Sequence, residues 1–466
     1  MLIAVAVIVL VVGSVLFHFL SPWYLTELAS NWSTIDDTIT ITFWVTGFVF
    51  VAVNLFMAYC VIKYRYNKDR RADYEPENSK LEWWLTGITT VGVAAMLAPG
   101  LFVWSDFVNV PADAHEVEAL GQQWHWTYRM PGADGQLGTV DSTLVSDANP
   151  FGMDPDDPRG QDDVLVDSPE VHLPLGKPVK LLLRSKDVLH NFTVAQFRVK
   201  MDLVPGLVSH MWLTPTRTGK FDILCEELCG IGHFAMRGIV VVDEPDVYEE
   251  WLAAQPTYAE LLATPAGDPQ RGAALYAVCG ACHGPQGQGM VAMNAPKLAG
   301  QEDWYLRRQL EYYKNGVRGA DPADTYGQQM APMANTLATD QAMRDVIAYI
   351  GTFPDLPVEA TIAGDVERGH QIYRVCGSCH GWDGEGIGAT KAPRQSGMQD
   401  WYLVRQLENF KQGIRGKHPD DLYGNQMIQM ANILKDDQAA NDVVAFINTL
   451  QHTDGTRLAM TSGEEE

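Results

Sequence analysis

Hydrophobic and polar residues divide the chain into three regions. Apolar residues run almost unbroken from Thr38 to Tyr64 and again from Leu81 to Val103, and a third apolar run occupies residues 1–20. Each of the two longer runs can cross the roughly 30 Å hydrocarbon core of a bilayer as a helix. We therefore predict a transmembrane helical hairpin over residues 38–106, preceded by a further apolar segment.

The first apolar segment allows two interpretations, a cleaved signal peptide or a helix that stays in the membrane. It lacks a basic stretch at its start, and no clear small-residue cleavage site follows Leu20. We favour a retained helix or signal anchor over residues 1–20, with the loop over residues 21–37 on the outer side.

Basic residues set the orientation of the hairpin. The connection between its helices carries Lys63, Arg65, Lys68, Arg70, Arg71 and Lys80. Short loops rich in lysine and arginine stay in the cytoplasm. The hairpin loop is therefore predicted inside, and everything after about Asp106 outside.

The middle region has the pattern of a β-sandwich or barrel. Short apolar, strand-like segments alternate with turn residues. These segments are Val179–Arg184, Val208–Leu213, Gly219–Leu224 and Gly238–Asp243.

The last region contains two copies of one helical unit, which lie 97 positions apart and align without a gap. Apolar residues at helical spacing predict a first, a middle and a last helix in each copy. We assign residues 266–355 and 363–452 to two all-α domains. The first and last helices should cross where paired aromatic residues meet, namely Tyr276 with Tyr349 and Tyr373 with Phe446.

Each copy contains a Cys-x-x-Cys-His segment, the attachment signature of a c-type haem. The two cysteines can form thioethers to the haem, and the adjacent histidine can ligate the iron. The segments use Cys279, Cys282 and His283 in the first copy and Cys376, Cys379 and His380 in the second. A redox dithiol or half of a zinc site is the alternative for Cys-x-x-Cys, but the histidine and the duplication argue against it.

A second axial ligand to each haem iron is expected further along each copy, because Met/His ligation is common in electron-transfer haems. Met330 and Met333 are the candidates in the first copy, with Met427 and Met430 at the equivalent places. The region resembles the dihaem cytochrome c family. That resemblance implies Met330 and Met427 as ligands, and we expect the other two methionines to fill the core.

A cluster of soft metal ligands follows the last strand-like segments. The cluster spans twelve residues and consists of Cys225, Cys229, His233 and Met236. These side chains form a ligand set that suits copper, whereas a disulfide would leave the histidine and the methionine unexplained. Two thiolates can bridge two coppers, each of which then needs its own imidazole. His190 is the candidate for the second imidazole, and His210 is a competitor that more plausibly points to the surface from mid-strand.

Residues 107–245 resemble the copper A (CuA) cupredoxin domain of cytochrome c oxidase subunit II. The resemblance implies bridging by Cys225 and Cys229, one imidazole each from His190 and His233, a weak ligand in Met236 and a backbone carbonyl ligand in Glu227. It also implies that the Glu227 side chain reaches a magnesium shared with subunit I, and that Trp124 is the entry point for electrons. The family usually has tyrosine at the position of His125 and a proline within Ala195-Gln196.

Nearly the whole chain therefore resembles a subunit II of a haem–copper oxidase fused to two cytochrome c domains. This implies electron transfer from two covalent haems to CuA and then to subunit I, for O₂ reduction coupled to proton pumping. Implied partners are subunits I and III and an upstream donor, either cytochrome c or a quinol-oxidising complex. The resemblance also implies that the chain is a multi-pass protein of a bacterial inner membrane, with its copper and haem domains on the periplasmic face. Glu82 resembles the glutamate at the mouth of a proton channel, although a headgroup-level glutamate is the alternative.

Two other functions remain open from the residues alone: a CuA subunit of a nitric oxide reductase, and a membrane-anchored electron carrier that is not part of an enzyme. No helical histidine set for an O₂-reducing site is present in the sequence. The net charge of −24 argues against nucleic acid as a partner.

Four smaller expectations concern loops and connections. We interpret the Asp-rich stretch over residues 147–167 as a solvated surface loop, with a docking surface or calcium site as the alternative, and residues 453–466 as a disordered tail. Cys60 is expected to be an ordinary core or lipid-facing residue. Connectivity alone suggests that the first haem unit lies nearer the copper domain.

Overall fold

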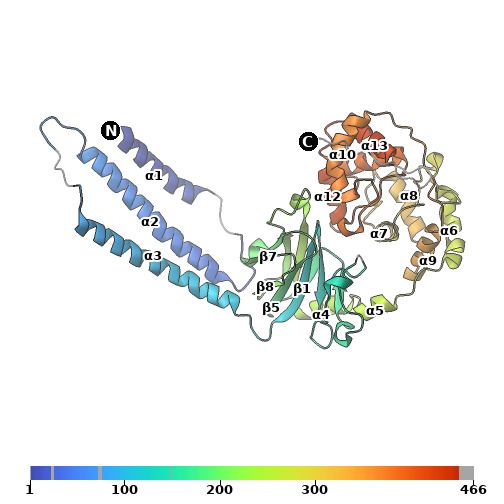
Figure 1. The fold of residues 1–466 in the computed structure, drawn as a ribbon, viewed down its shortest axis with the longest axis horizontal. Helices are drawn as coiled ribbons and strands as arrows, with labels where there is room; N and C mark the ends of the chain where they lie inside the picture. Colours follow the sequence, from blue (N-terminus) through green and yellow to red (C-terminus); the bar gives the residue numbers. More distant parts are fainter. Residues whose placement is uncertain (1, 22–25, 72–75, 147, 451–466) are drawn as a thin grey trace.

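The structure is a computed structural model that describes residues 2–21, 26–71, 76–146 and 148–450. Three long helices lie at one end, a β-sandwich lies in the middle, and shorter helices form the other end (Figure 1). This order confirms the predicted fold class. The predicted tail over residues 453–466 lies outside the described residues.

The apolar segments form α1 (Leu2–Leu20), α2 (Ser33–Lys63) and α3 (Ser79–Val108). All three are long and apolar enough to cross a membrane. Most of their large apolar side chains are exposed in the chain itself, as expected for surfaces that lipid or other membrane subunits cover. The first apolar run is thus a helix packed along α2, and its retention stays a prediction.

The residues just before α2 are fixed to the sandwich. The Trp32 indole donates a 2.9 Å hydrogen bond to the carbonyl of Trp212, and the Ser30 hydroxyl donates a 2.8 Å bond to the carbonyl of Phe197. This end of α2 therefore lies beside the sandwich, whereas the basic connection between α2 and α3 lies at the far end of both helices (Figure 1). The basic connection and the sandwich therefore lie at opposite ends of the hairpin, and which of them faces the cytoplasm stays a prediction.

The sandwich consists of two five-stranded sheets, ordered β3-β2-β1-β5-β8 and β4-β10-β9-β6-β7. Alternate residues of the strands point inward; on β5, for example, Leu181 and Leu183 are buried and their neighbours are not. His210 is exposed on β8, as predicted. The strands are β1 (His115–Gln122), β2 (His125–Met130), β3 (Val164–Val166), β4 (Glu170–Pro174), β5 (Val179–Ser185), β6 (His190–Thr193), β7 (Lys200–Leu203), β8 (Ser209–Leu213), β9 (Gly219–Leu224) and β10 (Arg237–Asp243).

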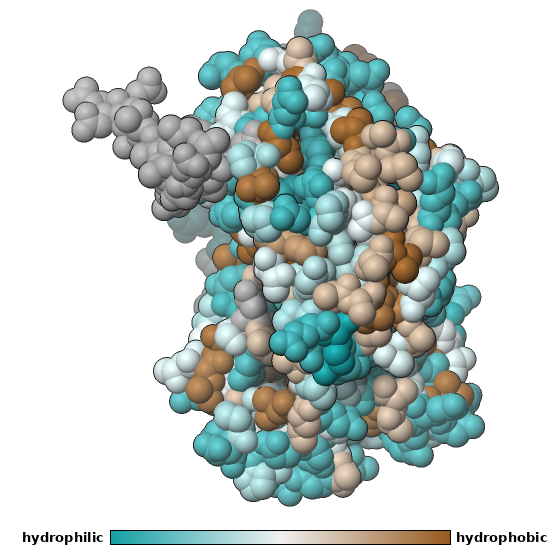
Figure 2. Space-filling view, turned by 90° about the vertical axis from the view of Figure 1, so that its right-hand side faces the viewer, coloured by the Kyte–Doolittle hydropathy of each residue, from teal (hydrophilic) through white to brown (hydrophobic). Residues whose placement is uncertain are grey.

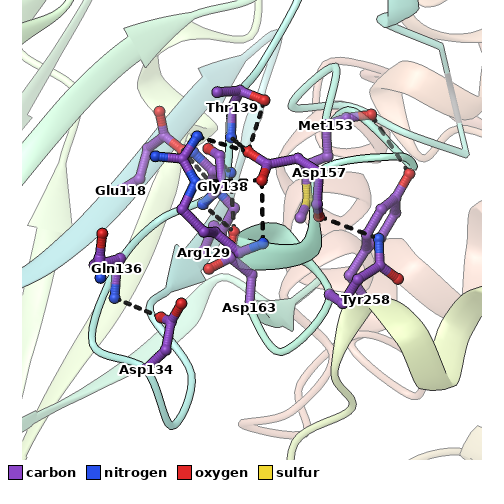
Figure 3. Close-up of polar contacts among 12 residues, drawn as sticks. Glu118, Arg129, Asp134, Gln136, Gly138, Thr139, Met153, Asp157, Asp163 and Tyr258 are labelled. Atoms are coloured by element: carbon purple, nitrogen blue, oxygen red, sulfur yellow. Dashed lines mark hydrogen bonds and ion pairs between the residues drawn. The ribbon is translucent and has the colours of Figure 1, made fainter.

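A buried charge cluster anchors the long connection between β2 and β3 (Figure 3). Arg129 on β2 forms ion pairs with Glu118 of β1 at 2.6 Å and with Asp163 at 3.1 Å. All three side chains are almost fully buried. Asp163 also accepts a hydrogen bond from the backbone N–H of Gly138, so the cluster ties both ends of the connection to the sheet.

The interpretation of residues 147–167 as a solvated loop holds for only part of the described stretch: Asp156 and Arg159, for example, are exposed, but other residues are not. Phe151 and Met153 are buried and pack in one cluster with Leu120 and Tyr258. The Tyr258 hydroxyl also bonds to the carbonyl of Met153 (Figure 3). The many aspartates suggest a loop that faces solvent, but the apolar residues between them pack together and give the loop a small core of its own.

Two short helices, α4 (Pro245–Ala253) and α5 (Tyr258–Ala263), connect the sandwich to the helical end. Two similar units follow, each of four helices. The first contains α6 (Pro269–His283), α7 (Asp303–Lys314), α8 (Thr325–Ala334) and α9 (Asp340–Ile350), and the second contains α10 (Val366–His380), α11 (Asp400–Gln412), α12 (Leu422–Ala431) and α13 (Asp437–Thr449).

In each unit the first and last helices cross at a glycine. A side chain at Gly272 would place its Cβ 2.0 Å from the carbonyl oxygen of Asp345, and Gly369 meets Asp442 in the same way. This close approach explains the Arg-Gly pair that repeats in the sequence. On the surface of this end of the molecule, hydrophobic residues lie in small groups among hydrophilic ones (Figure 2).

The aromatic contacts predicted at these crossings are present. The ring centroids of Tyr276 and Tyr349 lie 5.6 Å apart, and those of Tyr373 and Phe446 lie 5.3 Å apart. The structure adds one helix per unit, α8 and α12, that apolar spacing did not predict. Both begin at an aspartate that caps the helix, and both are too short to show a clear period.

Candidate copper and haem sites

The predicted copper ligands meet at one edge of the sandwich. His190 begins β6, Cys225 follows β9, and Cys229 lies in the turn that leads to β10. The two cysteine Sγ atoms are 3.6 Å apart, and Cys225 Sγ lies 4.0 Å from His190 Nδ1. The ligand atoms of these three buried residues all lie within 4.8 Å of one another.

The second half of the cluster is grouped around Cys229. Its Sγ lies 3.5 Å from His233 Nδ1 and 3.8 Å from Met236 Sδ. The carbonyl oxygen of Glu227 lies 3.3 Å from Cys225 Sγ. Two thiols between two imidazoles, with a thioether and a carbonyl at the flanks, form a donor set that suits copper.

Asp187 orients one imidazole of this cluster. Its carboxylate lies 2.8 Å from His190 Nε2, which leaves Nδ1 directed at the cysteines. It also accepts hydrogen bonds from the backbone N–H groups of Gln123 and Val188. Such a partner fixes the tautomer and direction of a metal-binding imidazole.

Trp124 covers the cysteine turn from outside. It is buried, and its indole N–H donates a 3.1 Å hydrogen bond to the carbonyl of Cys229. Gly232 lies so close to the indole that a Cβ there would fall 2.4 Å from a ring atom. The predicted electron-entry residue therefore contacts the backbone of a predicted copper ligand.

The two Cys-x-x-Cys-His segments end the first helix of each unit, α6 and α10. The Nδ1 atoms of His283 and His380 each donate a 2.7 Å hydrogen bond to a proline carbonyl, that of Pro296 or Pro393. This bond fixes a neutral ring whose lone pair is on Nε2, as an iron ligand requires. Burial lowers the pKa of His283, and it lowers that of His380 to about 4.

One cavity runs through both units. The cysteines and histidine of each attachment segment line it, with apolar residues over most of the remaining surface. All four candidate methionines, Met330, Met333, Met427 and Met430, also line it. Geometry therefore places both members of each methionine pair at the cavity, and the choice of ligand stays a prediction.

Two arginines extend into the same cavity from the joint between the units. Arg318 and Arg415 occupy equivalent positions in the repeat, and both line the cavity. Among the described residues neither forms an ion pair with a carboxylate, and the Nε atom of each has no hydrogen-bond partner. Unneutralised guanidinium groups here fit a cofactor that carries its own carboxylates.

The second unit, not the first, contacts the copper-ligand region. The amide of Gln426 on α12 donates hydrogen bonds to the carbonyls of Trp124 and Ala235, at 3.0 and 3.1 Å. Lys391 of the same unit forms a 2.7 Å ion pair with Asp167. The expectation from connectivity was therefore wrong. The chain leaves the sandwich through α4 and α5 and enters the helical end on its far side, whereas α12 of the second unit lies beside the sandwich (Figure 1).

The two glutamates singled out by resemblance lie apart. Glu227 is half-buried in the cysteine turn, and Glu82 is exposed in the first turn of α3. A magnesium site or a channel mouth would need groups from another chain, so both roles stay predictions.

Sequence reasoning missed Asp187, Gln426, Tyr423 and Lys391. Asp187 lies three residues before His190 and could have been found as an acidic neighbour of a predicted ligand. The other three lie in the second unit, and their partners in the copper region are at least 191 positions away. Only the docking of the two regions brings them together.

Comparison with protein families gives two matches. The model of the periplasmic domain of cytochrome c oxidase subunit II matches residues 115–243, and the cytochrome c model matches residues 269–354 and 366–451. The first match implies copper and the second implies haem c.

Individual relatives divide the chain in the same way. It is 58% identical over 261 residues to the alternative cytochrome c oxidase subunit 2 of Bradyrhizobium diazoefficiens, which covers 56% of this chain and 94% of that protein. It is 37% identical over 172 residues to cytochrome c4 of Azotobacter vinelandii, covering 34% of this chain and 80% of that one. Among solved structures, reduced cytochrome c4 from Pseudomonas stutzeri matches 39% of this chain and 98% of its own, with 28% identity and a TM-score of 0.32.

Proposed function

This chain belongs to the cytochrome c oxidase subunit II family, and from that membership we propose that it is the electron-entry subunit of a proton-pumping haem–copper oxidase. Its copper region would hold a dinuclear CuA centre, and its helical end would hold two covalent haems. In this proposal electrons would pass from the haems to the copper pair and then to subunit I, which would reduce O₂ to water.

The observation that carries this proposal is the pairing of two buried cysteines between two imidazoles. A single copper needs one thiolate, whereas two thiols 3.6 Å apart are spaced to bridge a metal pair. The proposed copper ligands are His190, Cys225, Glu227 through its carbonyl, Cys229, His233 and Met236.

The copper pair, when bound, supplies a one-electron carrier, and the residues around it keep it in a fixed and dry environment. Asp187 holds the His190 ring in place, and Trp124 closes the outer side of the turn. Hydrogen bonding to Cys229 and His190 lowers the pKa of the Cys225 thiol, whereas the bond with Cys225 and burial raise the pKa of Cys229. A rigid site with little rearrangement between redox states suits rapid electron transfer.

The haem ligands that we propose are Cys279, Cys282, His283 and Met330 in the first unit, and Cys376, Cys379, His380 and Met427 in the second. In each unit the proline carbonyl holds the histidine ring, and apolar residues exclude water from the cavity. Burial and methionine ligation both favour the reduced haem and so raise its potential.

The proposal extends to the surroundings of the chain. We place it in the bacterial inner membrane with its copper and haem regions in the periplasm, beside subunits I and III. The Glu227 side chain would reach a magnesium shared with subunit I, and Glu82 would lie at a proton-channel mouth. The upstream donor is cytochrome c or a quinol-oxidising complex.

Purification of the complex from membranes through a tag on this chain tests the function. We expect a haem–copper subunit I to co-purify, two c-type haems per chain, a near-infrared CuA band and O₂ consumption with proton release. Purification of the chain alone from native membranes would contradict an oxidase subunit and favour a free carrier. NO reduction without O₂ reduction would favour a nitric oxide reductase instead.

A further inference from the structure

The duplicated units present the same face to two different environments. Gln426 and Tyr423 of the second unit correspond to Gln329 and Tyr326 of the first, 97 positions earlier. Gln426 and Tyr423 are half-buried against the copper region, whereas Gln329 and Tyr326 are exposed. The same helix, α8 in one copy and α12 in the other, is thus free in the first unit and docked in the second.

The docked face contacts two segments of the copper region, the β1–β2 turn and the segment just before β10. Gln426 bonds to the carbonyl of Trp124, whose indole in turn bonds to the carbonyl of Cys229. Gln426 also bonds to the carbonyl of Ala235, the residue directly before Met236. Met427, the proposed iron ligand, is the next residue after Gln426, so few covalent and hydrogen bonds separate the two proposed metal sites.

Further contacts between the second unit and the copper region surround those of Gln426 and hold the two in place. Lys391 pairs with Asp167, and the amide of Gln122 donates to the carbonyl of Ala389. The rings of His125 and Tyr423 meet edge to face with centroids 6.1 Å apart. Burial lowers the pKa of His125 to about 3, so a neutral ring packs at this joint. In the first unit the counterpart of Lys391 is Asn294, which cannot form such an ion pair.

We propose that electrons leave the helical end only through α12, so that the second unit is the immediate donor to the copper site and the first is the outer acceptor. This rests on the proposed function of both regions as redox centres. One electron passes at a time: the iron in the second unit is oxidised from ferrous to ferric, and the copper pair is reduced by one electron. No bond is made or broken.

The docked arrangement is testable without any redox measurement. Treatment of the full-length chain in detergent with a zero-length carbodiimide should join Lys391 to Asp167, and peptide mapping should locate that link. Lys391→Gln and Asp167→Asn should each abolish it. A map that joins the copper region to the first unit, and not to the second, would overturn the proposal.

Electron transfer then tests the order. A single electron is injected into the fully loaded oxidised chain with a photoactivated ruthenium complex, and the haem and near-infrared copper bands are followed in time. Gln426→Ala should slow the haem-to-copper phase severalfold, and Tyr423→Leu should also slow it. The matched variant Gln329→Ala should leave that phase at the wild-type rate.

The outcomes separate this inference from the proposed function. Absence of the copper band or of either haem before the experiment would contradict the proposed function. Both centres present, with equal haem-to-copper rates in Gln426→Ala and Gln329→Ala, would overturn only the order. A slower phase in Gln329→Ala alone would assign the donor role to the first unit.

Discussion

Arg318 of the first unit donates a 3.1 Å hydrogen bond to the side chain of Gln406 in the second. The repeat reproduces this contact in reverse, since Arg415 donates to Gln309 at 2.9 Å. Two cations therefore lie at the joint, beside a cavity that both proposed haems share. Positive charge near an iron favours its ferrous state, so the joint should raise both haem potentials.

Arg318→Gln should accordingly lower the potential of a haem while both haems stay attached. Potentiometric titration of the haem absorption bands measures the effect. Arg307→Gln is the matched control, because Arg307 lies on α7 of the same unit but pairs with Glu311 at the surface. Equal potentials in Arg318→Gln and the wild type would show that no haem lies close to this guanidinium.

Met330→Leu and Met427→Leu should each remove one axial ligand. Each variant should lower the potential of one haem and weaken the methionine-to-iron absorption band, because a leucine side chain cannot ligate the iron. Met333→Leu and Met430→Leu are the controls and should leave both properties unchanged, since volume-conserving swaps cost little. The opposite pattern would move the ligand assignment to Met333 and Met430, which also line the cavity.

Cys229→Ser should abolish the near-infrared copper band and leave both c-type haems intact. The residue lies between Cys225, His233 and Met236, so its loss removes one bridge and leaves the remaining ligands unable to hold a metal pair. Absorption spectra and copper analysis per chain give the readout. Cys60→Ser, in α2, should change neither, and a retained copper band in Cys229→Ser would refute the assignment of this residue.

Asp187→Ala should weaken copper binding about 10–100-fold, the usual effect of losing a group that holds a metal-binding imidazole. The His190 ring would lose its 2.8 Å partner and rotate away from Cys225. Competition with a copper chelator measures the change. Asp222→Asn, on an exposed position of β9, should bind copper as the wild type does, and equal affinities in all three proteins would exclude this role for Asp187.

Local sequence patterns identified most of the fold and the candidate sites. Helical spacing, the repeat and the Cys-x-x-Cys-His segments depend on residues a few positions apart, so they could be read without coordinates. His190 was found 35 positions before Cys225 because a metal pair needs a second imidazole. The structure brings the two within 4.0 Å of each other.

What could not be predicted depends on docking between distant segments. Nothing near Gln426 in the sequence indicates that its amide meets Trp124, 302 positions away. Connectivity even pointed to the wrong unit, since it cannot tell which of two equal faces turns toward the copper edge. The prediction for the Asp-rich connection failed in part for a related reason, because composition does not reveal that Asp163 is buried against Arg129.

Arg129→Leu should destabilise the sandwich without removing any proposed metal ligand. The substitution leaves the buried Asp163 carboxyl without its cation and leaves Glu118 with only its partly exposed partner Arg184. Breaking a buried pair in this way typically costs about 3–5 kcal/mol. The whole chain does not unfold in one step, so hydrogen exchange of β1 and β2 is the suitable measure of local stability. Arg159→Leu, which removes an exposed partner of Asp157, should change this protection little.

The loss of stability caused by Arg129→Leu should also depend on pH. Burial raises the pKa of Asp163 to about 6 even beside Arg129, so the folded state binds its proton more tightly than the unfolded state does. A group of this kind favours folding below its unfolded pKa, and that contribution is lost as pH rises through about 6. Without the guanidinium the pKa of Asp163 should rise further, so this carboxyl holds its proton to still higher pH. The deficit relative to the wild type should therefore be smaller at about pH 5 than at about pH 8. An equal deficit at both values would mean that the destabilisation comes from lost packing and not from uncompensated buried charge.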